Sequence, residues 1–316
     1  MRTILFLALG EPEPTARLFR AALRTGARIV LDLEDALWDV DDEDRTAALK
    51  ASGRELLVAL ARDHAGLFER DGIGVRINRF GSRESDLDIE AIGRAGRFAR
   101  VECVVVPKVE NGGVLTGCAD ALERHGVSRP DLVPIVETRA AFARLGDLLR
   151  DARESGVRWV VYGHYDFALE SGMWPIPGPF DPALWARADE VADAAESAGM
   201  GYIHPPCFDV YDDAELYAIL QRLVATRRRE FGILTVGLHQ AAAAVRFRPG
   251  TAGPEPGPTG PAPVGDPVAL ACRTTAAYRE TRRPGTSFAL DTRHGEFISP
   301  HVYLAARRYL AENGHV

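Results

Sequence analysis

Charged side chains follow several apolar runs of the chain, each at the point where the run ends. The run ARIVLDLEDA, residues 27–36, passes from strand-forming residues into Asp32, Glu34 and Asp35. A lone buried carboxylate tends to take up a proton, whereas several can stay ionised around a divalent cation or an arginine. The other charged or polar groups at such ends are Arg76 and Asn78, Lys108 and Glu110, Glu137, and Asp166.

Two carboxylates with open positions for water and a substrate oxygen are typical of a Mg²⁺ site. Glu137 and Asp166 follow neighbouring apolar runs, so we expect them to share Mg²⁺, with Mn²⁺ as the alternative ion. Any one of the acids could instead cap a helix or form half of an ion pair. For Asp35 and Glu110 that alternative has equal weight.

The elements that must position these residues are short β-branched runs alternating with longer helical patterns. Eight such runs occupy about the first 240 residues and predict an α/β fold, a (β/α)8 TIM barrel with a C-terminal helical lid segment. A doubly wound sheet usually has a glycine-rich loop after its first strand, and LALGEPEPT is a poor one. The predicted strands are TILFLAL, RIVLDLE, GIGVRIN, VECVVVP, LVPIVE, RWVVYG, MGYIH and GILTVG.

In a TIM barrel the carboxyl ends of all strands open onto one face, which carries the chemistry. The charged strand ends are therefore expected to meet there. We expect three parts of the chain: a catalytic barrel over 1–245, a flexible Pro/Gly-rich linker over 246–267, and a helical lid segment over 268–316. The lid segment is too small for a core of its own, so it should pack on the barrel mouth or on a neighbouring subunit.

Composition excludes several classes of function. The chain has 316 residues, 46% of them hydrophobic, and a formal net charge of −7 with acids and bases interspersed. The sequence has no basic patch that would indicate nucleic-acid binding, and no polybasic helix or apolar span that would indicate a membrane. The short apolar run at its start lacks a signal-peptide pattern. We therefore expect a cytoplasmic protein. The four cysteines have no CxxC spacing, which argues against a disulfide framework or a zinc site.

Five motifs resemble, in the same order, those of the HpcH/HpaI aldolase and citrate lyase β-subunit superfamily: VLDLEDA, VRIN, VPKVE, PIVET and YGHYDFALESG. Within that superfamily the resemblance is to the citrate-lyase-β-like and malyl-CoA-lyase-like branch. The resemblance spans roughly residues 2–240 and resumes weakly at DTRHGEFISPHVYLAARRYL. It implies a TIM barrel in which Glu137 and Asp166 bind Mg²⁺ and Arg76 faces the reacting oxygen. It also implies that Glu34 and Asp35 line the pocket or orient metal-bound water, and that the protein forms a homotrimer or a larger homo-oligomer.

The activity implied is that of a Mg²⁺-dependent carbon–carbon lyase of the aldolase or citrate-lyase type. A bond next to a carbonyl is made or broken through a metal-bound 2-oxo acid and an enolate. Catalysis is assigned to Arg76, Glu137 and Asp166. Substrate binding is assigned to Glu34, Asp35, Arg76 and Lys108, and to the segment Gly163, His164 and Tyr165, whose backbone N–H groups could hold a carboxylate.

The chain departs from these relatives at the lid, where Ser299 stands at the position of their general-base acid. A serine cannot accept a proton near neutral pH without a partner base, and His294, Glu296 or His301 could take that part. The segment that helps to hold coenzyme A in relatives and the strand-8 pattern are also altered. Two alternatives stay open: an acyl-CoA thioester hydrolase that uses metal-bound water, and a barrel that binds without catalysis.

Overall fold

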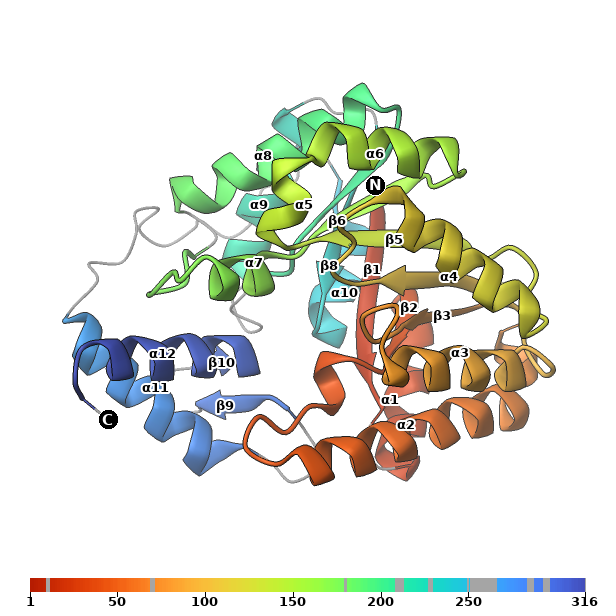
Figure 1. Ribbon diagram of the computed structural model, residues 1–316, viewed down its shortest axis with the longest axis horizontal. Coiled ribbons are helices and arrows are strands. Elements are labelled where there is room, and N and C mark those ends of the chain that lie inside the picture. Colours follow the sequence, from red (N-terminus) through yellow and green to blue (C-terminus); the bar gives the residue numbers. More distant parts are fainter. Residues whose placement is uncertain are drawn as a thin grey trace.

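The computed structural model describes residues 1–9, 12–68, 72–178, 181–207, 213–226, 230–248, 250, 266–282, 287–291 and 296–315. Within these ranges, eight strands pair in parallel and in sequence order, and β1 also pairs with β8, so the sheet closes into a barrel (Figure 1). The predicted TIM barrel is confirmed. The strands are β1 (Arg2–Ala8), β2 (Arg28–Asp32), β3 (Ile73–Arg76), β4 (Val101–Val106), β5 (Asp131–Val136), β6 (Trp159–Tyr162), β7 (Gly201–His204) and β8 (Phe231–Thr235).

Helices follow the strands and cover the outside of the barrel (Figure 1). Several begin at a side chain that accepts a backbone N–H, such as Asp42, Ser82 and Asp181, which is the usual way to satisfy the first turn. The α-helices of this layer are α1 (Pro12–Leu23), α2 (Glu43–Asp63), α3 (Arg83–Ala95), α4 (Gly112–Arg124), α5 (Arg139–Ala143), α6 (Leu145–Glu154), α7 (His164–Glu170), α8 (Pro182–Ser197), α9 (Asp213–Ala225) and α10 (Leu238–Arg246), with single 3-10 turns η1 (Asp35–Leu37) and η2 (Ala65–Leu67).

Strand residues alternate between two buried layers. One set points into the barrel, where Val30, Val105, Ile135, Val161 and Ile203 pack together with other strand residues. The other set faces the helices and forms the larger core between sheet and helix layer. The strands are therefore apolar on both faces, as parallel strands in an α/β fold are, and this accounts for their near-continuous β-branched runs.

The C-terminal segment forms α11 (Pro267–Thr281), the antiparallel pair β9 (Ala289–Asp291) and β10 (Glu296–Ile298), and α12 (Pro300–Glu312). Its two helices pack on each other through the stacked rings of Tyr278 and Tyr303, 4.2 Å apart. The segment lies at one side of the barrel, with α12 against α7 (Figure 1). Most of the predicted linker, 249 and 251–265, lies outside the described residues, so the boundaries at 245 and 268 stay predictions.

Two local features differ from or add to the sequence prediction. The pattern TRAAFARLGDLLRDARESG predicts one helix, but the helix breaks at Arg144, whose φ of −131° is not helical, into α5 and α6. All four cysteines are free thiols, and Cys103 is buried in the barrel interior as a small apolar residue. No helix in the described part of the chain is long and apolar enough to cross a membrane.

Candidate active site

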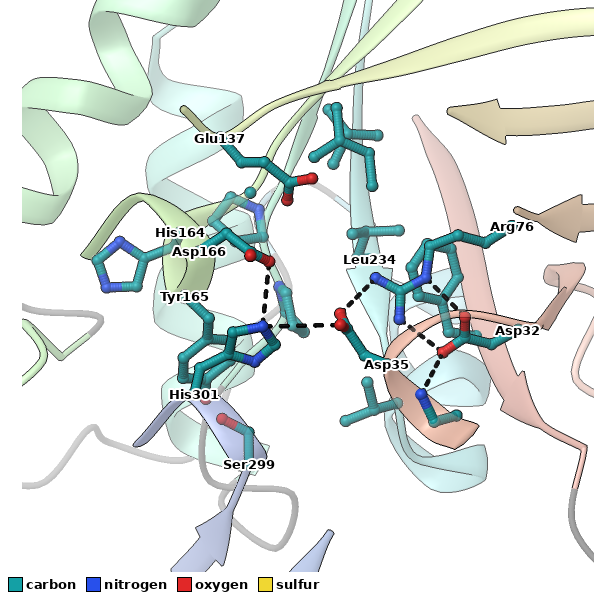
Figure 2. A pocket seen from close by; sticks show the side chains of 18 of the residues that line it. Asp32, Asp35, Arg76, Glu137, His164, Tyr165, Asp166, Leu234, Ser299 and His301 are labelled. Atoms are coloured by element: carbon teal, nitrogen blue, oxygen red, sulfur yellow. Dashed lines mark hydrogen bonds and ion pairs between the residues drawn. The ribbon is translucent and has the colours of Figure 1, made fainter. Parts of the chain in front are cut away.

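A pocket of about 190 Å³ opens at the carboxyl ends of the strands, where the fold places the predicted site residues. Of these residues, Asp35, Arg76, Glu137, Gly163, His164, Tyr165 and Asp166 line it, together with Ser299 and His301 of the C-terminal segment. Figure 2 shows the carboxylates of Glu137, Asp166 and Asp35 directed toward the same space. Strand ends and the lid segment therefore meet at one site.

Arg76, the last residue of β3, is held by the acids that follow β2. Its Nε and Nη2 donate to the two oxygens of Asp32, at 2.7 and 2.5 Å, which is a bidentate pair. Its Nη1 donates to Asp35 at 2.8 Å and lies 3.0 Å from a carboxylate oxygen of Glu34. The guanidinium is buried, and its carbon lies 4.7 Å from the centre of the Phe6 ring. Its permanent positive charge is thus fixed in position.

Asp32 belongs to this site, although the sequence reasoning assigned it no role. It pairs with Arg76 in the β2–β3 register, and its oxygens also accept from the backbone N–H groups of Glu34 and Ala36. Aligning the predicted strands places Asp32 opposite Arg76 on the neighbouring strand. The sequence therefore contains a signal for this pair. Asp32 shapes the turn that delivers Glu34 and Asp35.

Lys108 connects the two acidic groups of the mouth. Its Nζ lies 2.7 Å from Glu34 and 3.1 Å from Asp166, and its backbone N–H donates to Glu137 at 2.8 Å. Its φ is 53°, a conformation that non-glycine residues rarely adopt and that often marks functional sites. Burial would lower the pKa of Lys108, but the surrounding carboxylates raise it, so the side chain is an ammonium ion.

Glu137, at the end of β5, is buried and leans against Gly163 at the end of β6. A Cβ at Gly163 would lie 2.5 Å from the Cβ of Glu137 and closer still to its carboxylate. Burial and the charge of Asp166 raise the pKa of Glu137 well above its usual value, only partly offset by Lys108. Two neighbouring carboxylates that destabilise each other's charge form a site suited to a cation.

His301 enters the site from the start of α12. Its Nε2 lies 3.1 Å from Asp166 and 3.6 Å from Asp35, between the two carboxylates (Figure 2). Its ring stacks on Tyr165 at 6.1 Å and meets Trp38 edge-on. Burial lowers the pKa of His301, but Asp166 and Asp35 outweigh it and raise the value to about 9.

The pKa values of the two aspartates beside His301 are shifted in opposite directions. Burial and the charge of Glu34 raise the pKa of Asp35 to about 7. Burial acts in the same direction on Asp166, but His301 and Lys108 hold its pKa below the usual range. Suitable ligand atoms of Asp35, Asp166 and His301 all lie within 4.8 Å of one another. This arrangement could hold a metal ion; of the two predicted ligands it contains Asp166, and it adds Asp35 and His301.

Ser299 lines the pocket but has a structural part, because its Oγ accepts the backbone N–H of Val302 and caps α12. Of the three residues considered as substitutes for the lid acid, His294 and the side chain of Glu296 lie outside the described residues. His301 alone is described, and it reaches the carboxylates. The sequence signal is SPH, since a serine cap and a proline at the first helical position place the histidine one residue later.

The structure places the remaining predicted residues, Glu34, His164 and Glu110, in three different surroundings. Glu34 is buried, and its pKa lies below the usual value because Lys108 and Arg76 outweigh burial. His164 lines the pocket, but its ring nitrogens lie 3.2 Å from the Tyr162 hydroxyl and 2.9 Å from the Pro177 carbonyl oxygen. Burial lowers the pKa of His164 to about 4, so the ring is neutral. Glu110, left open in the sequence, pairs with Arg79 outside the pocket lining.

Comparison with solved structures finds proteins of the same fold. Malate synthase from Haloferax volcanii, solved with magnesium and glyoxylate, matches with a TM-score of 0.69 and 16% identity, over 98% of this chain and 89% of the other. CitE from Mycobacterium tuberculosis, solved with magnesium and pyruvate, matches with 0.59 and 18%, over 80% and 92%. RipC from Yersinia pestis matches with 0.54 and 21%, over 78% and 93%.

These likenesses show that the chain has the fold of these proteins. The match to malate synthase extends over 98% of the chain, whereas those to CitE and RipC cover 80% and 78%. No protein-family model matches the sequence, and no curated protein matches it.

Proposed function

We propose that the protein is a divalent-metal-dependent carbon–carbon lyase or aldolase of the HpcH/HpaI aldolase and citrate lyase β-subunit superfamily. Its substrate or product would be a 2-oxo acid. The supporting observation is an excess of carboxylate at the mouth: five acids, Asp32, Glu34, Asp35, Glu137 and Asp166, face three cationic groups, Arg76, Lys108 and His301. When all are ionised, the excess equals the charge of one divalent cation.

Mg²⁺, with Mn²⁺ as the alternative, would be held by Glu137 and Asp166, and Asp35 offers a further carboxylate oxygen close to Asp166. The Lys108 ammonium already lies against Asp166, so the space between these acids accepts positive charge. A bound metal would polarise the keto oxygen of the substrate as a Lewis acid. The donor set is therefore compatible with the ion, being mostly carboxylate oxygen as Mg²⁺ prefers.

The chain's own residues would stabilise the charge that develops during cleavage. The bond between the hydroxyl-bearing carbon and the carbon next to the carbonyl breaks, the hydroxyl proton leaves, and the electron pair stays on the second carbon as an enolate. Arg76 cannot lose its proton and is held by Asp32, so it can face the enolate oxygen without reorganisation. Loss of such a stabilising group costs about 10²–10³ in rate.

We assign the proton transfer to His301. It is the one titratable side chain that the described part of the C-terminal segment contributes to the pocket lining. Histidine is the residue most often used for this purpose, and its neighbours Asp35 and Asp166 orient the ring. In this proposal, His301 takes the part of the general-base acid that the resembling lyases have at the position of Ser299.

A second candidate is condensation of a 2-oxo acid with an acyl thioester. It is favoured by the malate synthase match, which extends over 98% of the chain. Release of free coenzyme A from acetyl-CoA only when a 2-oxo acid is present would support condensation, whereas release without it would support thioester hydrolysis.

We also propose that the protein is a homotrimer. Sedimentation velocity measures the oligomeric state directly.

The decisive experiment is calorimetric titration of the protein with Mg²⁺, and then with pyruvate at saturating Mg²⁺. We expect pyruvate to bind only with the metal present. Glu137→Gln and Asp166→Asn each remove one carboxylate charge with little change in shape, so each should weaken Mg²⁺ binding by at least about tenfold.

Glu110→Gln is the matched control, because Glu110 follows β4 at the same face but does not line the pocket. It should bind Mg²⁺ and pyruvate like the unmodified protein. Unchanged Mg²⁺ binding in both Glu137→Gln and Asp166→Asn would contradict the proposed function.

A further inference from the structure

The pocket lining combines charged and apolar residues. The carboxylates, Arg76 and His301 come from the ends of β2, β3, β5 and β6 and from the start of α12. Apolar lining residues such as Ile135 and Val161 come from the strands that carry the acids, and the ends of β7, β8 and the lid strands contribute Pro205, Pro206, Cys207, Leu234, Val236, Phe288 and Phe297. None of these carries a charge. We call the last seven residues the apolar wall.

The end of β7 offers the pocket few hydrogen-bond donors. Pro205 and Pro206 have no backbone N–H, and the thiol of Cys207 donates to Glu215 at 2.9 Å. Loops after strands 7 and 8 of TIM barrels frequently bind phosphate, and that requires N–H groups or cations. Among the described residues of this wall, which exclude 208–212, no side chain is cationic, and two of the seven residues lack a backbone N–H. The wall is therefore suited to hydrocarbon.

The lid strands supply the outer part of the wall. Phe288 precedes β9 and Phe297 lies in β10, and their rings stack with centroids 4.8 Å apart. Both rings are half-buried, so part of each aromatic surface remains accessible at the pocket. Aromatic faces exposed in a concave site are typical of the recognition of apolar ligand groups.

The size of the pocket exceeds the needs of the smallest 2-oxo acids. An apolar protein cavity of about 150 Å³ binds benzene, and this pocket measures about 190 Å³. Glyoxylate has no side chain and pyruvate has one methyl group. Either of them, placed with its oxygens toward a metal ion held by Glu137 and Asp166, would have no side chain large enough to cover the apolar wall.

We propose that the 2-oxo acid bound here carries a branched aliphatic or aromatic side chain, which packs against the apolar wall while its keto and carboxylate oxygens face the acidic side. This inference rests on the proposed function and specifies its substrate class. Each methylene removed from water strengthens binding about fourfold, so a larger side chain should produce a clear gain.

The test is calorimetric titration at saturating Mg²⁺ with pyruvate, 4-methyl-2-oxopentanoate and phenylpyruvate. We expect the two larger acids to bind at least about tenfold more tightly than pyruvate. Phe288→Ala should reduce that preference several-fold and leave pyruvate binding within about twofold. Retained pyruvate binding also verifies that the variant has kept its folded site.

Phe98→Ala is the matched control, because Phe98 is exposed and does not line the pocket. It should leave all three affinities unchanged. Pyruvate binding as tightly as the larger acids, or Phe288→Ala weakening all three acids equally, would overturn the inference and leave the proposed function standing. Failure of every 2-oxo acid to bind with Mg²⁺ would instead overturn the proposed function, and the inference with it.

Discussion

At the scale of single residues, Gly163 shows how the site depends on a missing side chain. It directly follows β6, beside Glu137, and the space that a Cβ would occupy is filled by the Glu137 side chain. Its φ of −97° is ordinary, so the need for glycine comes from close approach and not from backbone conformation. The carboxylate position is therefore fixed by contact with the neighbouring strand.

We predict that Gly163→Ala displaces Glu137 and weakens Mg²⁺ binding by at least about tenfold. Forcing a methyl group into this packed position should also cost about 1–3 kcal/mol of unfolding free energy. Calorimetry measures the first effect and urea denaturation the second.

Gly146→Ala provides the control for this substitution. Gly146 is the second residue of α6 and has no atom near its missing Cβ, so alanine there should not lower stability and should leave Mg²⁺ binding unchanged. Unchanged Mg²⁺ binding in Gly163→Ala would contradict this prediction, because it would show that the Glu137 side chain is not fixed by its close contact with residue 163.

At the scale of elements, the start of α12 contributes residues to the site. Ser299 caps its first turn, Pro300 occupies the first helical position, and His301 follows in the same turn. An imidazolium near a helix N-terminus is disfavoured by the helix dipole, and here Asp35 and Asp166 outweigh that effect. The cap and the histidine therefore have separate parts, one in the helix and one in the site.

We predict that Ser299→Ala lowers the free energy of unfolding by about 0.5–2 kcal/mol, the usual cost of a lost N-cap, and changes Mg²⁺ affinity less than threefold. Ser82→Ala, which removes the equivalent cap of α3, should give a similar loss of stability. A large loss of Mg²⁺ binding with unchanged stability in Ser299→Ala would assign Ser299 to the chemistry instead.

The elements of the barrel could be predicted from sequence because each strand is a local apolar run and each helix a local pattern. Glu137 and Asp166 could be placed at one face because parallel strands align their carboxyl ends. His301 could be named from sequence only as one of three candidates, because its partners Asp35 and Asp166 lie far away along the chain and their contact with it depends on how α12 docks. The break at Arg144 likewise has no proline or cap to announce it.

At the scale of the whole molecule, the C-terminal segment joins the barrel at several places, and two of these junctions involve the residues that follow β2. Arg282 pairs with Asp39 at 2.6 Å and the Ser287 hydroxyl accepts from the Trp38 backbone, both beside the turn that follows β2. His301 makes the second junction, at Asp166 and Asp35 (Figure 2). Docking of the segment thus depends partly on the charge of one imidazole.

That dependence predicts a pH effect on the metal-free protein. The pKa of His301 is raised from 6.5 to about 9 on folding, because Asp166 and Asp35 outweigh burial. The folded state therefore binds this proton more tightly, and the resulting stabilisation is complete below about pH 6.5 and disappears as pH rises through about 9. Asp35, with its pKa raised to about 7, adds a decline of the same sign that begins at lower pH.

The measurement is thermal unfolding in the presence of a chelator between pH 6 and 10. We expect the melting temperature of the unmodified protein to fall across this interval more steeply than that of His301→Gln, whose side chain stays neutral throughout. His315→Gln, at an exposed position near the C-terminus, should follow the unmodified protein. Parallel curves for the unmodified protein and His301→Gln would mean that the imidazole does not hold the C-terminal segment to the barrel through its charge.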